Sequence, residues 1–136
     1  MASSVVWPGH RRVLVVDDDI GHAYPLADLI EALGHQCWVV RDGYSAVNRA
    51  FHVQADMVLV ATELPLMCGF EVCQRLRKNS LGRPVQIVAM SNSGDDDERR
   101  EAEDCGFDEL VAKPVDGKTL SRLLHRGGVE QRRQAA

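Results

Sequence analysis

The sequence predicts a single α/β domain in which a parallel sheet is covered by helices on both faces. Short runs of β-branched and aliphatic residues alternate with stretches whose apolar residues recur at helical spacing. Each apolar run stops abruptly at polar or acidic residues, as buried parallel strands do where they reach solvent. The chain has 136 residues, of which 45% are hydrophobic, and this length suits one compact domain. Strands that alternate with helices imply crossover connections and a parallel sheet.

Five strands are predicted from the apolar runs. The first starts at Val13 and ends in three aspartates. The central one is Met57–Ala61, which is too short for a typical helix and is followed by a polar turn containing Pro65 and Gly69. Pro84 opens the fourth strand, and Lys113 follows the fifth. The predicted strands are residues 13–16, 37–40, 57–61, 85–90 and 110–112.

Five helices are predicted between and after these strands. The first has inward apolar residues from Ala23 to Leu33 and ends at Gly34, a natural left-handed stop, which places Pro25 in its first turn. The fourth has three acids in its first turn but few apolar residues, so we expect it to be weakly anchored. The predicted helices are residues 23–33, 45–51, 70–76, 95–105 and 120–124. The second is expected to direct Ala46, Val47, Ala50 and Phe51 inward.

Composition excludes several function classes. Sixteen Lys and Arg residues against 20 Asp and Glu give a formal charge of -4, so no basic field favours nucleic acid. No apolar stretch approaches the roughly 18 residues of a membrane-spanning helix, which predicts a cytoplasmic protein without membrane association. The four cysteines form no CxxC pair and are expected to be reduced and mostly buried.

Polar residues at the predicted strand ends should meet at one edge of the sheet, where parallel sheets bind ligands. Neighbouring carboxylates repel each other unless a cation lies between them, and Mg²⁺ prefers one or two carboxylates with carbonyls, water and phosphate oxygens. A hydroxyl and an ammonium opposite them would suit a phosphoryl group. The acidic turn after the first strand has no G-x-G-x-x-G, which argues against nucleotide binding. The residues at these strand ends are Asp17, Asp18, Ala61, Glu63, Ser91 and Lys113.

These residues resemble the receiver domain of two-component response regulators over about 12–124, most closely the receivers of hybrid histidine kinases. The motifs that carry the resemblance are 13–19, 57–69 and 106–115. The resemblance implies a flavodoxin-like (βα)5 three-layer sandwich of strand order 2-1-3-4-5. It also implies that Asp17, Asp18 and the main-chain carbonyl of Glu63 hold Mg²⁺, and that Ser91 and Lys113 contact a phosphoryl group. By the same resemblance the Lys113-Pro114 peptide should be cis, with Lys113 directed at Asp17 or Asp18.

Two departures from the family pattern change the functional expectation. The phospho-acceptor aspartate of the family falls on Ala61, and a methyl group cannot form an acyl phosphate. The aromatic switch residue of the family falls on Leu110. Magnesium binding is therefore expected to be weak, with Ser91 and Lys113 as remnants of a phosphate site. Glu63 is more naturally a solvated side chain than a ligand, and the five histidines, His22 included, are interpreted as surface residues.

We therefore interpret residues 13–125 as a non-enzymatic pseudo-receiver, flanked by flexible segments at 1–12 and 126–136. The expected partner is a histidine kinase or another signalling protein, bound independently of phosphate through the fourth helix, the fifth strand and the fifth helix. That face includes Arg99, Arg100, Glu103 and Lys118; a homodimer stays open. One alternative is an ordinary phospho-accepting receiver whose acceptor has been replaced by Ala61, and a lower-ranked one is an enzyme or cofactor binder of the same fold.

Overall fold

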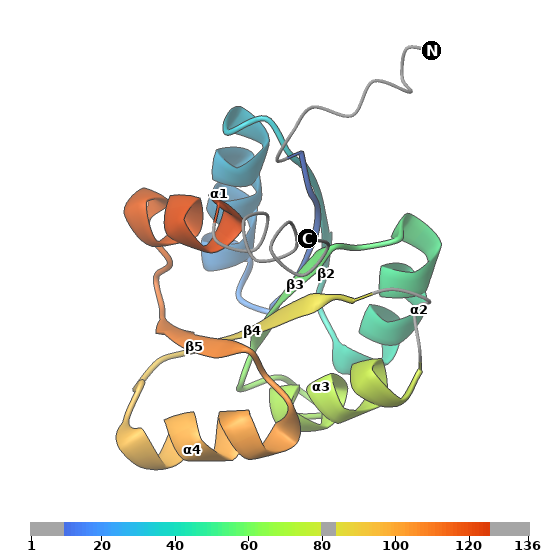
Figure 1. The fold of residues 1–136 in the computed structure, drawn as a ribbon, viewed down its shortest axis with the longest axis vertical. Helices are drawn as coiled ribbons and strands as arrows, with labels where there is room; N and C mark the ends of the chain where they lie inside the picture. The colour runs from blue at the N-terminus through green and yellow to red at the C-terminus, as the bar shows by residue number, and fades with distance from the viewer. Residues whose placement is uncertain (1–9, 80–83, 126–136) are drawn as a thin grey trace, which may run out of the picture.

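The computed structural model describes residues 10–79 and 84–125, which form a three-layer α/β sandwich (Figure 1). All strand pairs are parallel, and the order is β2-β1-β3-β4-β5, so the predicted fold is confirmed. The strands are β1 (Arg12–Val16), β2 (Gln36–Val40), β3 (Met57–Ala61), β4 (Gln86–Ser91) and β5 (Glu109–Ala112). The helices are α1 (Ile20–Ala32), α2 (Gly43–Val53), α3 (Gly69–Lys78), α4 (Asp96–Cys105) and a final helix at residues 117–125.

Alternate residues of the central strands supply two separate cores. In β1, Val13 and Val15 face the core beneath α1 and the final helix, whereas Leu14 and Val16 face the core beneath α2, α3 and α4. All five residues of β3 are buried, since helices cover both faces of the sheet. The last of them, Ala61, packs on the α1 side.

Two elements differ from the sequence-based prediction. Helix α1 begins at Ile20, after Asp19 in the N-cap position, so Pro25 lies inside the helix and not in its first turn. The prediction was wrong because Ile20, Gly21 and His22 supply no buried apolar residue, so the periodic pattern starts only at Ala23. In α2, Ala46, Ala50 and Val53 are buried and Val47 packs partly buried against the same core, but Phe51 is 62% exposed, not buried. The helix begins at Gly43, two residues before the predicted start, after Asp42 in the N-cap position, whose side chain accepts the Ser45 N–H at 2.8 Å.

The cysteines are free, but they are less buried than predicted. Cys73 is buried, Cys37 and Cys105 are half-buried, and Cys68 is exposed. Cys68 precedes α3, and Cys105 ends an amphipathic surface helix, which explains their exposure. Burial raises the pKa of Cys37 to about 12 and that of Cys73 to about 11, so both remain protonated thiols at neutral pH.

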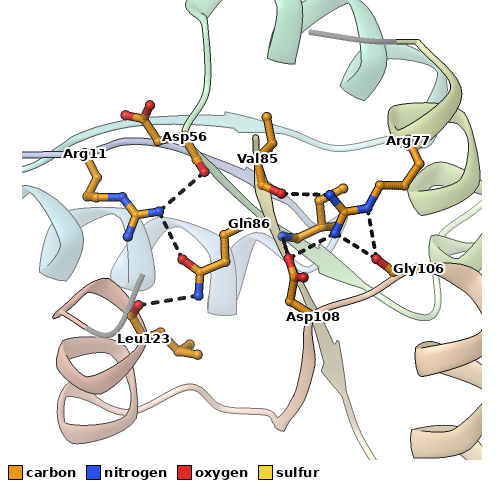
Figure 2. Close-up of polar contacts among 9 residues, drawn as sticks. Arg11, Asp56, Arg77, Val85, Gln86, Gly106, Asp108 and Leu123 are labelled. Atoms are coloured by element: carbon orange, nitrogen blue, oxygen red, sulfur yellow. Dashed lines mark hydrogen bonds and ion pairs between the residues drawn. The ribbon is translucent and has the colours of Figure 1, made fainter. Parts of the chain in front are cut away.

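The edge of the sheet opposite the acidic strand ends is held partly by Arg11 (Figure 2). Its guanidinium is buried and donates to the Leu124 carbonyl at 3.0 Å, to the Gln86 side chain at 3.0 Å and to the Asp56 carbonyl at 3.4 Å. The Gln86 amide in turn reaches the Leu123 carbonyl at 3.5 Å. These contacts join Leu123 and Leu124 of the final helix to the amino ends of the strands. Strand β1 begins at Arg12, one residue before the predicted start, whereas residues 1–9 and 126–136 of the predicted flexible segments lie outside the described part.

Arg77 of α3 fixes the same edge on the other side of the sheet (Figure 2). It donates to the carbonyls of Val85 and Gly106 at 2.8 Å each and pairs with Asp108 at 3.0 Å. Asp108 also accepts the Ile87 N–H at 2.8 Å. Arg77 therefore joins α3 to the start of β4 and to the turn before β5. These contacts lie at the end of the sheet away from the acidic strand ends.

Candidate functional site

The carboxyl ends of β1, β3, β4 and β5 meet at one edge, where the structure places a shallow acidic pocket. Two of the predicted site residues, Asp17 and Ser91, are fully buried beneath it, together with Ala61. Thr62, between Ala61 and Glu63, is also buried and contributes to the wall. The pocket is lined by Asp18, Asp19, Thr62, Glu63, Leu64, Pro65, Cys68, Asn92 and Lys113.

Asp17 carries the central charge of the site. The ammonium of Lys113 lies 3.0 Å from its Oδ2 and 3.2 Å from its Oδ1. Oδ1 also accepts the Asp19 N–H at 3.0 Å, and Oδ2 lies 2.8 Å from Nδ1 of His22. The Lys113-Pro114 peptide is cis, and Lys113 contacts Asp17, both as predicted. The carboxylate is buried but fully hydrogen-bonded, as a charge in the interior requires.

His22 lies in the candidate site, although the sequence interpretation took it for a surface residue. Its side chain is 9% exposed, so the prediction of a surface histidine was wrong. The Val115 N–H donates to its Nε2 at 3.1 Å, and because a backbone N–H can only donate, Nε2 must be the unprotonated nitrogen. Nδ1 therefore carries the proton and donates it to Asp17. His22 thus joins the end of β1 to the segment after Lys113. The sequence signal that could have indicated this role is its position five residues after Asp17, where a helix begins beside the strand end.

Ser91 ends β4 and is hydrogen-bonded on every side. Its hydroxyl donates to a carboxylate oxygen of Glu98 in α4 and accepts the N–H groups of Ser93 and Gly94 at 3.1 and 2.9 Å. The hydroxyl of Ser93 donates to the same Glu98 oxygen at 3.0 Å. Neither Glu98 nor Ser93 stood out in the sequence, because their partnership depends on the fold of the loop between β4 and α4.

The remaining acidic residues lie at the rim. Asp18 and Glu63 are exposed, and the only contact shown for Glu63 within the described residues is a long one of 3.5 Å from the Asn92 amide. Both oxygens of Asp17 are taken by Lys113, His22 and the Asp19 N–H. Within residues 10–79 and 84–125, no three His, Cys, Asp or Glu side chains are grouped so that they could hold a metal ion. Of the predicted Mg²⁺ ligands, Asp17 faces the ammonium of Lys113, with which a metal ion at this carboxylate would have to compete.

Leu110, at the predicted switch position, is buried in the core beneath α2, α3 and α4. Its carbonyl accepts a hydrogen bond from the Arg99 guanidinium at 3.1 Å. Arg99 therefore fixes α4 to β5, whereas Arg100 pairs only loosely with Asp97, at 3.8 Å, and is 76% exposed. An aliphatic side chain in a packed core has no polar group that could couple to Ser91.

Comparison with known proteins identifies the family. The family model of the response regulator receiver domain matches residues 13–125. The chain is 32% identical over 112 residues to the sensor histidine kinase RcsC of Salmonella typhimurium, and the aligned region covers 82% of this chain and 12% of that protein. It is 33% identical over 120 residues to the sensory transduction protein RegX3 of Mycobacterium bovis, covering 85% of this chain and 52% of that protein. The chain thus spans a small part of the first relative and about half of the second.

Solved structures agree in fold. The receiver domain of the sensor histidine kinase PA1611 from Pseudomonas aeruginosa, with a magnesium ion in its active-site cleft, has a TM-score of 0.79 and 26% identity, covering 88% of this chain and 98% of that one. The chemotaxis protein CheY4 of Vibrio cholerae has a TM-score of 0.80 and 24% identity, covering 86% and 98%. No helix in the described ranges has the length and apolar character that crossing a bilayer requires. The chain belongs to the receiver-domain family of two-component signal transduction.

Proposed function

We propose that this receiver domain acts as a phosphorylation-independent protein interaction module. The observation that carries the proposal is Ala61, a buried methyl group at the end of β3, where the family resemblance places the phosphate-accepting aspartate. Lys113 pairs with Asp17 instead of a carboxylate at this position. The domain would then catalyse no reaction of its own. It would act in the cytoplasm as part of a two-component pathway.

Ser91 and Lys113 are proposed as remnants of the phosphate site, and Asp17, Asp18 and the Glu63 carbonyl as a weak Mg²⁺ site. The PA1611 receiver holds magnesium in its cleft, which supports a cation at this edge of the fold. Here a cation would rely on Asp18 and the Glu63 carbonyl unless Lys113 left Asp17. Magnesium, when bound, would supply positive charge for phosphate oxygens, whereas Lys113 already balances the charge of Asp17 without it.

Phosphorylation of the unmodified chain tests the proposal. With Mg²⁺ and acetyl phosphate at neutral pH, the chain should gain no phosphoryl group, because no carboxylate occupies the Ala61 position. Ala61→Asp should gain one, since Asp18 and Lys113 still line the pocket next to which Ala61 ends β3. Ala61→Asn, of similar size but without a nucleophile, is the matched control. Intact-mass measurement gives the result, and a phosphoryl adduct on the unmodified chain would refute the proposal.

The partner is proposed to be a histidine kinase or another signalling protein that contacts α4, β5 and the final helix. Arg100→Glu should weaken binding by about tenfold, because it reverses an exposed charge on that face, while Asp18→Asn at the acidic pocket should leave binding unchanged. Arg100 is the better probe than Arg99, which supports β5. Calorimetry without phosphodonor measures the binding of the candidate kinase to each variant. If the acidic pocket were the contact site, Asp18→Asn would weaken binding more than Arg100→Glu.

A further inference from the structure

The hydroxyl of Ser91 has no unused hydrogen-bonding capacity. A serine hydroxyl has one proton to donate and two lone pairs to accept with. The proton goes to Glu98, and the lone pairs receive the N–H groups of Ser93 and Gly94. Ser91 is also 0% exposed. It could bind a phosphoryl oxygen only by giving up one of these internal partners.

Glu98 is held in place from its own helix. It lies in the first turn of α4, where the Asp95 side chain caps the helix by accepting the Glu98 N–H at 2.8 Å. One oxygen of the Glu98 carboxylate accepts from both Ser91 and Ser93. Hydrogen bonds to an ionised carboxylate are stronger than neutral ones, and a negative charge is favourable at a helix N-terminus. The side chain therefore joins the end of β4, the loop after it and the start of α4.

Helix α4 has little else to hold its first turn. Of its ten residues, Ala102 alone is buried, and the Arg99 contact with the Leu110 carbonyl holds its middle. Its N-terminal turn is otherwise made of exposed aspartates. A helix with few buried apolar contacts opens easily, so the Glu98 contacts carry a large share of the order at this end.

We propose that Glu98 is a built-in anionic ligand for Ser91, which holds the loop between β4 and α4, and the first turn of α4, in one conformation without a phosphoryl group. The Glu98 carboxylate oxygen accepts the Ser91 hydroxyl proton that a phosphoryl oxygen would otherwise accept. The face that includes α4 is thereby fixed by the chain itself. This inference goes beyond the proposed function, because it concerns the conformation of α4 whether or not a partner reads it.

Hydrogen exchange of the backbone amides in residues 92–98 tests the proposal on the unmodified chain and on Glu98→Ala. Removing the carboxylate should accelerate exchange of these amides by about tenfold, since the Ser91 hydroxyl loses its acceptor and the loop loses its link to α4. Glu98→Gln should accelerate it much less, because an amide oxygen still accepts from both hydroxyls. Glu103→Ala removes an exposed glutamate of the same helix and should leave these amides unchanged.

Ser93→Ala is a milder variant that keeps Glu98 and its contact with Ser91. It should accelerate exchange of the same amides by about threefold, because one of the two hydroxyls that hold the carboxylate is lost. Equal exchange in Glu98→Ala and Glu103→Ala would overturn the proposal, as would faster exchange in Glu98→Gln than in Glu98→Ala. No phosphodonor is used, so the outcome is independent of whether the Ala61→Asp variant accepts phosphate.

Discussion

Gly69→Ala should lower the free energy of unfolding by about 3 kcal/mol, at the upper end of the usual cost of overpacking. An added Cβ at Gly69 would lie 2.2 Å from the carbonyl oxygen of Ala61 and 2.9 Å from the Thr62 Cα. Both are backbone atoms, and both belong to a strand end paired within the sheet, so neither can move aside by rotating a side chain. The Gly69 N–H also donates to the Thr62 carbonyl at 3.0 Å, so a shift of α3 would break this contact as well.

Gly21→Ala is the matched control, because Gly21 also lies in the first turn of a helix that follows a strand end. A Cβ there would meet only an Asp19 side-chain oxygen at 3.4 Å, and alanine favours the helix by about 0.5–1 kcal/mol over glycine. Urea unfolding of both variants gives the comparison. If Gly69→Ala proved as stable as Gly21→Ala, α3 would not pack on the Ala61 carbonyl as closely as the structure shows.

Local sequence patterns were sufficient for the fold and for part of the site. Buried strands of a parallel sheet are short apolar runs, so their ends could be located, and parallel topology then brings Asp17, Ser91 and Lys113 to one edge. The assignment of these positions to a receiver came from the family resemblance. Ala61 was visible in the sequence because it occupies a known place in that pattern.

The contacts that complete the site could not be predicted in the same way. His22 and Glu98 are polar residues on helices, and on sequence alone either one suits a solvated surface. Their partners, Val115 and Ser91, are 93 and 7 residues away, and the pairings depend on how each helix is placed over its strand end. Phe51 was misplaced for a related reason: apolar character alone does not show on which side of a short helix a residue lies.

Asp17→Ala should lower the free energy of unfolding by about 3 kcal/mol, whereas Asp18→Ala should change it by less than about 0.5 kcal/mol. The side chain of Asp17 is 0% exposed, and those of Lys113 and His22 are 10% and 9% exposed. Without the carboxylate, the Lys113 ammonium and the Nδ1–H of His22 lose their acceptor in a largely dry environment, and the Asp19 N–H loses its contact too. Asp18 lies exposed at the pocket rim, where water replaces any lost interaction.

Comparing Asp17→Ala with Asp18→Ala distinguishes two possible roles of this acidic pair: holding a cation, or balancing the charge of Lys113. If the pair served mainly to hold a cation, both substitutions would relieve repulsion and raise stability in metal-free buffer. If Asp17 is instead the internal counter-charge of Lys113 and the hydrogen-bond acceptor of a neutral His22, only Asp17→Ala is costly, and adding Mg²⁺ changes the result little. Asp17→Asn should fall between the two, since its amide oxygen can still accept from Lys113. Chemical unfolding in buffer with a chelator and then with Mg²⁺ measures each case. Equal stability of Asp17→Ala and Asp18→Ala would show that Lys113 and His22 find other partners.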